Sequence, residues 1–178
     1  MKFLVLASTV LIYSNLVFAK ADLSPKKIES IAIAGKEVSI QYSAPSVRGR
    51  EGKLFNSGGK ISTDPNYPVW RAGANAATTL HTESDLNIGG LDVPKGDYTL
   101  FVNLKDPDVW ELVVNKQTGQ WGLKYNKDKD LGRVKMTMTK PPQMVEVLKY
   151  TLSDAADKKG TLKLEWEDYS ASVPLTVK

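Results

Sequence analysis

The chain has 178 residues, of which 42% are hydrophobic and 25% charged, and its formal net charge is +4. A chain of this length can bury a core large enough to be stable without disulfides, which matters because it contains no cysteine. The lack of cysteine excludes zinc–thiolate and disulfide redox sites. Basic and acidic residues are interspersed, so we expect no nucleic-acid partner.

The first 21 residues have the composition of a secretory signal peptide. Lys2 gives a positive start, an apolar stretch extends to Phe18, and Ala19-Lys20-Ala21 supplies the small residues that a signal peptidase cleaves. A membrane anchor is the alternative, but polar residues interrupt the apolar stretch, which favours cleavage. We therefore expect a periplasmic or secreted protein with a single domain over residues 22–178. It should have no membrane span after cleavage, and the sequence specifies no oligomeric state.

Apolar and polar residues alternate over most of the chain, which predicts β-strands. A first hairpin is expected over residues 28–42, with its turn at Ala34-Gly35-Lys36. A second is expected over residues 97–115, and its second strand is apolar on much of both faces, which indicates a central strand. Further strands are predicted around residues 134–138, 147–152, 162–166 and 173–177.

Turn residues recur roughly every eight to twelve positions, and no segment has a helical apolar stripe. This spacing predicts an all-β fold, either an antiparallel β-sandwich or a jelly roll. Residues 47–69 are the exception, because their Gly, Ser, Asn, Asp and Pro content predicts a long loop. Trp70, Trp110 and Trp166 are predicted to be buried, whereas Trp121 follows a turn and is the best candidate for exposure among the four tryptophans.

The segment from Trp70 to His81 is rich in side chains that can bind a ligand or transfer a proton. Its alternate positions are polar, and an extended backbone would turn them to one face. A guanidinium can hold a carboxylate or phosphate, an amide can orient a ligand, and an imidazole can bind a metal or move a proton. The alternative is that each side chain has a structural partner. The candidate ligand-binding residues are Arg71, Asn75, Thr79, His81, Glu83 and Trp121.

The chain lacks residues that familiar catalytic and cofactor-binding motifs require. The single histidine excludes a multi-histidine zinc site, and no serine occupies a Gly-x-Ser-x-Gly turn. Gly58-Gly59-Lys60 lacks the other residues of a phosphate-binding loop. Asn126, Asp128 and Asp130 alternate like calcium ligands, but the glycine is displaced and no acid closes the loop, so a solvated turn is predicted. We predict no cofactor and no metal, and the sequence nominates no catalytic residue.

Several runs of this sequence resemble a known bacterial family. They are Pro45-Ser46-Val47-Arg48-Gly49-Arg50, Trp70-Arg71-Ala72-Gly73-Ala74-Asn75, Ile88-Gly89-Gly90, the run from Val93 to Phe101, and Gln120-Trp121-Gly122. Together they are similar to domain-of-unknown-function family 2911 over essentially the whole chain after the signal peptide. The resemblance implies an exported β domain and no established activity. Many members have a glutamate where this chain has Ala76, so a mechanism that needs that glutamate is not expected here.

Three functions are compatible with these features. The favoured one is a non-catalytic exported β-sandwich that binds a small polar ligand or an envelope glycan through Arg71 and Asn75. The second is a hydrolase or metal-assisted enzyme that uses His81 with Glu83, Arg71 and a carboxylate from residues 47–69. The third is a structural or partner-binding envelope protein.

Overall fold

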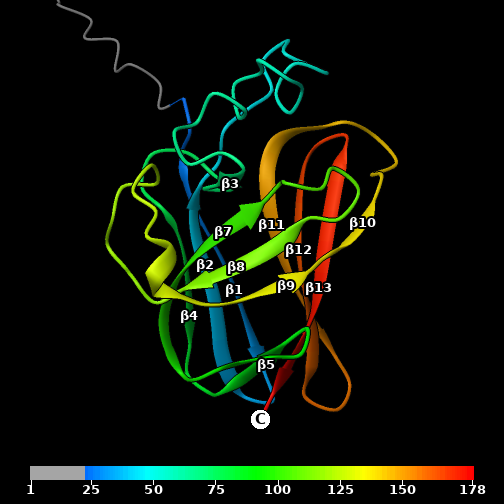
Figure 1. Ribbon diagram of the computed structural model, residues 1–178. Coiled ribbons are helices and arrows are strands. Elements are labelled where there is room, and N and C mark those ends of the chain that lie inside the picture. Colours follow the sequence, from blue (N-terminus) through cyan, green and yellow to red (C-terminus); the bar gives the residue numbers. More distant parts are fainter. Residues whose placement is uncertain (1–22) are drawn as a thin grey trace, which may run out of the picture.

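The computed structural model describes residues 23–178, and these form two antiparallel β-sheets that pack face to face (Figure 1). The all-β sandwich predicted from the alternating pattern is therefore confirmed. The predicted signal peptide, residues 1–21, lies outside the described residues.

The first sheet contains the two predicted hairpins. Its strands, in spatial order, are β1 (Lys26–Ile33), β2 (Lys36–Ser43), β4 (Thr78–Thr82), β7 (Gly96–Asn103), β8 (Glu111–Asn115) and β9 (Asp130–Lys135). The short β3 (Val69–Trp70) pairs with β7 beyond the end of β4. The β1–β2 turn has positive φ at Ala34 and Gly35, the backbone that a tight hairpin requires.

The second sheet is built mainly from the C-terminal third of the chain. Its strands, in order, are β11 (Val145–Ala155), β12 (Lys159–Glu167), β13 (Tyr169–Val177), β5 (Leu86–Ile88) and β6 (Leu91–Val93), with β10 (Thr137–Thr139) also paired to β13. The short β5–β6 hairpin thus crosses from the first part of the sequence to the edge of this sheet (Figure 1).

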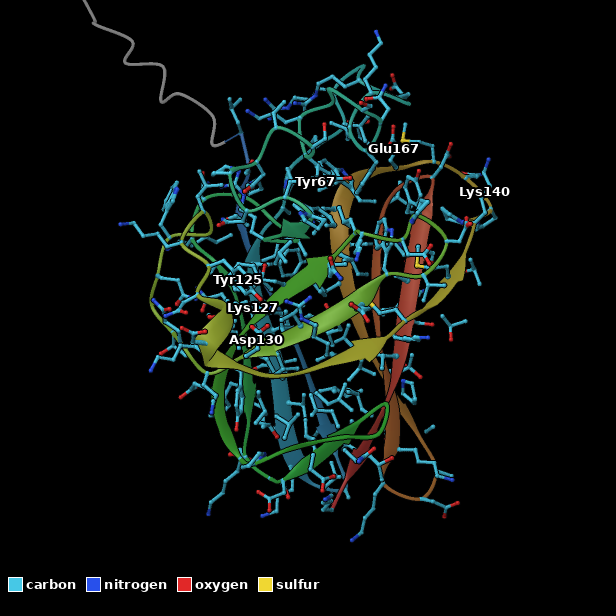
Figure 2. All side chains as sticks on the ribbon, in the orientation of Figure 1. Tyr67, Tyr125, Lys127, Asp130, Lys140 and Glu167 are labelled. Atoms are coloured by element: carbon cyan, nitrogen blue, oxygen red, sulfur yellow. The ribbon has the colours of Figure 1, made fainter. Side chains whose placement is uncertain are left out.

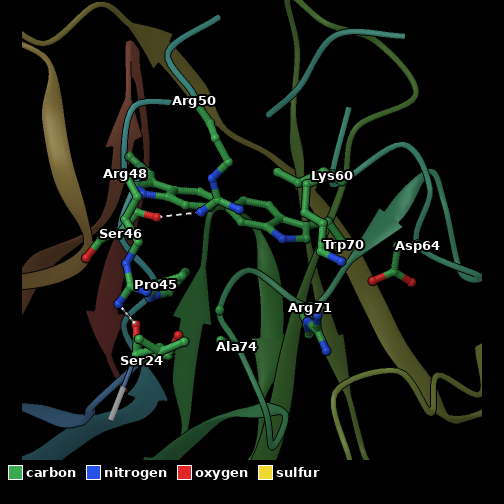
Figure 3. Close-up of a pocket in the computed structure, with 14 residues that line it drawn as sticks. Ser24, Pro45, Ser46, Arg48, Arg50, Lys60, Asp64, Trp70, Arg71 and Ala74 are labelled. Atoms are coloured by element: carbon green, nitrogen blue, oxygen red, sulfur yellow. Dashed lines mark hydrogen bonds between the residues drawn. The ribbon is translucent and has the colours of Figure 1, made fainter. Parts of the chain in front are cut away.

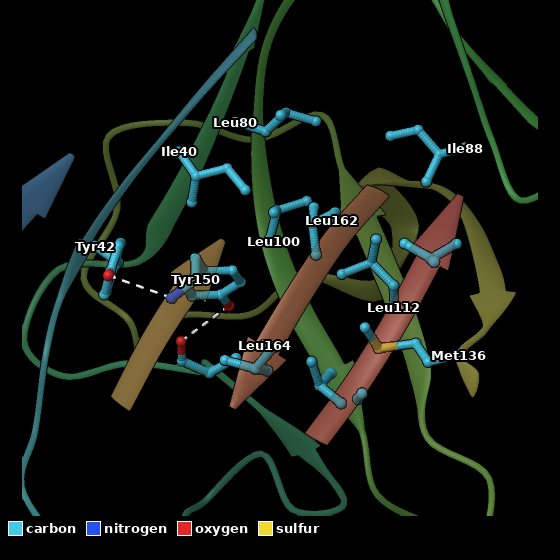
Figure 4. Packing of buried hydrophobic residues seen from close by; sticks show 14 of the residues in the cluster. Ile40, Tyr42, Leu80, Ile88, Leu100, Leu112, Met136, Tyr150, Leu162 and Leu164 are labelled. Atoms are coloured by element: carbon cyan, nitrogen blue, oxygen red, sulfur yellow. Dashed lines mark hydrogen bonds between the residues drawn. The ribbon is translucent and has the colours of Figure 1, made fainter. Parts of the chain in front are cut away.

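The main core lies between the two sheets. Ile40, Leu80 and Leu100 from the first sheet face Leu162 and Leu164 from the second, and all five are buried (Figure 4). Burial of such side chains contributes about 1.5–3 kcal/mol each. This interdigitation explains why one parity of each strand is apolar.

Strand β8 is buried on both faces, as its sequence predicts. Leu112 and Val114 belong to the core between the sheets, whereas Val113 packs with Phe101 in a smaller cluster on the other side. Tyr125 covers that second cluster, with its ring centroid 4.9 Å from that of Phe101. The chain after β8 therefore folds back over the outer face of the first sheet.

The long segment between β2 and β3 has no strand within its bounds, which confirms the predicted loop. It is anchored because Leu54 and Ile61 are buried in the core. Phe55 from this loop contacts Trp70, Trp110 and other core rings, at centroid distances of 5.4 and 5.3 Å for these two. The loop thus forms a cap of fixed shape over one end of the sandwich.

The tryptophan predictions are confirmed. Trp70, Trp110 and Trp166 are buried, whereas the side chain of Trp121 is 51% exposed. Among residues 23–178, no helix is long and apolar enough to cross a bilayer.

The segment with alternating Asn and Asp residues forms a short 3₁₀ turn, Lys127–Lys129. Figure 2 shows Tyr125 and Asp130 beside it, at the edge of the first sheet. The carboxylate of Asp130 accepts hydrogen bonds from the amide of Asn115 (2.8 Å) and the hydroxyl of Tyr125 (2.6 Å). Burial, together with the neighbouring Asp130, raises the pKa of Tyr125 to about 12, so this hydroxyl remains a donor to the carboxylate.

Candidate functional site

The prediction of one extended segment from Trp70 to His81 is wrong. Strand β3 ends at Trp70 and β4 begins at Thr78, and between them Ala72 (φ 45°) and Asn75 (φ 59°) adopt the left-handed conformation. The alternation of side chains therefore breaks after Trp70. Tertiary hydrogen bonds explain the break, because Tyr150 donates its hydroxyl proton to the Ala72 carbonyl at 3.0 Å.

Arg71, the first residue of this irregular segment, lines a cavity of about 230 Å³. Figure 3 shows the cavity between the long loop, the segment after β3 and the start of the described chain. Its lining is rich in cationic and aromatic side chains, namely Arg48, Arg50, Lys60, Arg71, Trp70 and Trp166, with the carboxylate of Asp64 among them.

Two of these cations are held in place by backbone carbonyl groups. Arg50 donates from Nε to Val47 O and from Nη2 to Ser46 O, both at 2.7 Å. Arg48 donates from Nη2 to Leu23 O, also at 2.7 Å. Carbonyl acceptors fix the direction of a guanidinium but leave its positive charge unneutralised. The cavity wall is thus positively charged and preorganised.

The start of the loop that carries these arginines is fastened to the second sheet. Ser46 forms an isolated bridge with Val147 of β11, and the Val47 amide donates to the carbonyl of Glu146 at 2.8 Å. The carboxylate of Glu146 also accepts from the backbone amide of Arg48 at 3.0 Å. These contacts set the position of the loop relative to β11.

Arg71 is partly buried, and its side chain lies against Gly122. A Cβ atom added at Gly122 would lie 2.6 Å from Cδ of Arg71 and 2.8 Å from the carbonyl oxygen of Asn75. Only a glycine leaves room for Arg71 in this position. Within residues 23–178, the guanidinium of Arg71 makes no hydrogen bond or ion pair, and neither does the ammonium group of Lys60.

Trp166 adds a further donor to the cavity lining. Its side chain is only 5% exposed, and its indole Nε1 has no acceptor among the residues that the structure describes. The ring stacks on that of Trp70, with centroids 5.9 Å apart and planes inclined by 12°. A buried N–H without an acceptor is destabilising, and a ligand or water that reached it would relieve that cost.

His81 and Glu83 lie on exposed positions outside this cavity, and each has a partner. Nδ1 of His81 lies 2.8 Å from Oδ1 of Asp97 on the neighbouring strand β7. The carboxylate of Glu83 accepts from the backbone amide of Glu37 at 2.9 Å, which extends the pairing of β2 and β4. Each side chain therefore has a local partner, and a ligand-binding role for His81 and Glu83 stays a prediction.

The remaining candidates lie beside a second, smaller cavity or at the surface. Thr79 lines this cavity of about 140 Å³ with Gln41 and Gln120. The exposed Asn75 uses its backbone carbonyl to accept from the Gly122 amide at 2.9 Å. Trp121 pairs with Ala76 through an isolated bridge and projects into solvent. A ligand-binding role for these residues stays a prediction.

Sequence reasoning nominated Arg71 but missed the other side chains around it. Arg48 and Arg50 were visible only as part of a family-like run, and Lys60 only as part of a failed phosphate-loop motif. Trp166 was correctly placed in the core, but alternation along a strand does not reveal whether an indole N–H finds an acceptor. The loop brings these residues together through contacts distant in sequence.

A family model described as a protein of unknown function, DUF2911, matches residues 24–175. The chain belongs to this family. The match covers both sheets and all residues of the Arg71 cavity except Leu23, and the family brings no assigned activity. No curated protein and no solved structure is significantly similar to the chain.

Proposed function

We propose that this DUF2911 member is a non-catalytic, exported binding module that holds a small polar ligand in the Arg71 cavity. The observation that carries the proposal is the free guanidinium of Arg71, which lies partly buried at the cavity without a partner in residues 23–178. Arginines removed from water are ordinarily paired, because desolvation of an unpaired charge is costly. A ligand that accepts hydrogen bonds would supply the missing partner.

The composition of the lining supports binding rather than turnover. Apart from the carboxylate of Asp64, its charged side chains and the indole N–H are donors that do not accept protons readily, and the single histidine of the chain lies elsewhere. The export signal expected in residues 1–21 places such a module in the periplasm or outside the cell, where the ligand is either a free small molecule or a unit of an envelope glycan.

A ligand screen tests this proposal. Thermal unfolding of the purified protein is measured against a panel of neutral and charged small polar molecules and envelope glycan fragments, with Arg71→Gln and His81→Gln as paired variants. We expect at least one compound to raise the Tm of the wild type and of His81→Gln, with at least tenfold weaker binding to Arg71→Gln. Equal binding to Arg71→Gln, or no binding by any compound, would contradict the proposal.

An enzyme that uses His81 is the second candidate, and the close contact between His81 and Asp97 is the observation in its favour. An orienting carboxylate beside a histidine is common in active sites. Both side chains, however, are exposed at the surface of the first sheet. Turnover of ester, glycoside or peptide substrates that is lost in His81→Ala would establish this function.

A further inference from the structure

We propose that the ligand of the Arg71 cavity carries an oxyanion, a carboxylate or a phosphate, attached to a short apolar or planar body. This inference rests on the proposed binding function and specifies the chemistry of what is bound. It follows from the charge of the lining, from the kind of hydrogen-bonding groups that remain free, and from the size of the cavity.

The charge of the lining is strongly positive. Four cationic side chains and one carboxylate, Asp64, line the cavity in the part of the chain that the structure describes. One oxygen of Asp64 already accepts a hydrogen bond from the backbone amide of Asn66 at 2.9 Å. Asp64 keeps its negative charge, but within residues 23–178 it forms no ion pair with Lys60 or Arg71, so an anion in the cavity would find two unpaired cations in the lining.

The free hydrogen-bonding groups are donors. A guanidinium, an ammonium group and an indole N–H can only donate, and Arg71, Lys60 and Trp166 supply one of each. A neutral sugar brings hydroxyl protons that need acceptors of their own, and among the lining side chains only the carboxylate of Asp64 and two serine hydroxyls can accept them. A carboxylate or phosphate brings acceptors only, so its hydrogen-bonding capacity complements this wall.

The aromatic floor and the volume limit the rest of the ligand. Trp70 and Trp166 stack on each other and both line the cavity, so an apolar or planar group can be covered by their rings. The volume of about 230 Å³ is below the range of about 300–1,000 Å³ typical of sites for drug-sized molecules. An oxyanion with a body no larger than one ring fits these limits.

Calorimetric titration in phosphate-free buffer tests the inference with four probes: inorganic phosphate, phenyl phosphate, benzoate and methyl glucoside. We expect the two aromatic anions to bind and methyl glucoside not to bind. Whichever anion binds more tightly identifies the oxyanion as phosphate or carboxylate, and phosphate alone should bind more weakly than its phenyl ester. Affinity should fall as salt rises, because the cations are only partly shielded from solvent.

Two lysine variants distinguish anion binding in the cavity from nonspecific attraction to the positive charge of the protein. Lys60→Gln should weaken phenyl phosphate or benzoate binding by about tenfold. Lys53→Gln is the matched control, because Lys53 is an exposed lysine of the same loop that does not line the cavity. In NMR spectra, the indole N–H signal of Trp166, assigned with Trp166→Phe, should shift on binding. Equal loss in Lys60→Gln and Lys53→Gln, or an unmoved Trp166 signal, would overturn the inference.

The failures of the two proposals are distinguishable. Binding of methyl glucoside or another neutral compound that depends on Arg71, without binding of either anion, would leave the binding function intact and contradict the oxyanion. If no compound in either experiment binds through Arg71, the binding function itself fails. Anion binding that persists unchanged in Arg71→Gln would also count against both.

Discussion

The candidate ligand-binding side chains between residues 70 and 83 fall into two halves, residues 70–77 and residues 78–83. The two halves differ in what their side chains contact. In the second half, His81 contacts Asp97 and Glu83 accepts from the Glu37 amide. In the first half, the side chain of Arg71 lies in a cavity and has no polar partner within residues 23–178. Polar side chains thus have local partners in the second half, whereas Arg71 in the first half remains available to a ligand.

The comparison shows that a free polar group, rather than an exposed one, is the better guide to binding. His81 and Glu83 are both more exposed than Arg71, yet they have local partners. Arg71 is partly withdrawn from water and held there by the packing of the segment that follows it. Five substitutions, taken from the largest expected effect to the smallest, test this difference and the electrostatics of the strand that carries Trp166.

Replacement of Gly122 should disturb the first half most. Gly122→Ala would force its Cβ against Arg71 and the Asn75 carbonyl, so we expect the free energy of unfolding to fall by about 2–3 kcal/mol. Ligand binding should fall as Arg71 is displaced. In the control, Gly119→Ala, the Cβ meets open space and only the positive φ is strained, at about 1 kcal/mol. Equal losses in urea unfolding would mean that Arg71 does not depend on Gly122.

Removal of the Tyr150 hydroxyl should loosen the turn that positions Arg71. Tyr150 is buried and donates to the Ala72 carbonyl, so Tyr150→Phe should lower the free energy of unfolding by about 1–2 kcal/mol. Hydrogen exchange around residues 71–75 should increase, and exchange in β4 should not. Tyr169→Phe is the control, because the Tyr169 hydroxyl has no hydrogen bond in residues 23–178. Similar results for both variants would contradict an anchoring role.

Glu165 and Glu167 flank Trp166 on β12, and their pKa values shift in opposite directions. Burial opposes ionisation of Glu165, but ion pairs with Lys149 (3.1 Å) and Lys163 (3.2 Å) bring its pKa below the ordinary value of 4.5. Burial raises the pKa of Glu167 above 4.5. Ionised Glu165 therefore stabilises the fold above about pH 4.5 and this contribution is lost as the pH falls. The stability linked to protonated Glu167 is present below pH 4.5 and is lost as the pH rises through its raised pKa.

Single amide variants should separate these two contributions. Glu165→Gln should lose stability relative to the wild type at pH 7, with a smaller difference at pH 3.5. Glu167→Gln retains an acceptor for the Gly52 amide, so relative to the wild type it should gain most at pH 7 and least at pH 3.5. Urea unfolding between pH 3.5 and 7 measures both differences. Identical pH profiles for the two variants would contradict the assigned directions.

Substitutions in the second half should have the smallest effect. The His81–Asp97 pair is exposed, and exposed pairs contribute little, so His81→Ala should change the free energy of unfolding by less than about 0.5 kcal/mol. It should leave ligand affinity unchanged. Asp97→Asn serves as the matched variant from the other side of the contact. A large loss of binding in His81→Ala would mean that the two halves act as one site.

Much of the fold was predictable because it depends on local pattern. Alternation over residues 28–42 and 97–115 predicted both hairpins, and the two apolar faces of the strand at 111–115 predicted its central position. The three buried tryptophans and the exposed Trp121 followed from their place in strands or after a turn. These features depend on the burial of every second residue along a strand, and the alternation of apolar and polar residues in the sequence shows that burial directly.

The candidate site was only partly predictable. Arg71 was nominated for its chemistry, but the extended backbone invoked for it does not exist, because hydrogen bonds from Tyr150 and Thr78 to the Ala72 carbonyl favour a turn. Tyr150 lies 78 residues from Ala72 in the sequence. A pattern over neighbouring residues carries no information about such a contact.

The sequence by itself determined an all-β chain with apolar alternation, two hairpins, a long loop and family membership. Only the tertiary structure decided which polar side chains are paired and which face an open cavity. The physical reason is that strand formation depends on residues adjacent in sequence, whereas the surroundings of Arg71, Lys60 and Trp166 depend on how a loop folds over the end of two sheets.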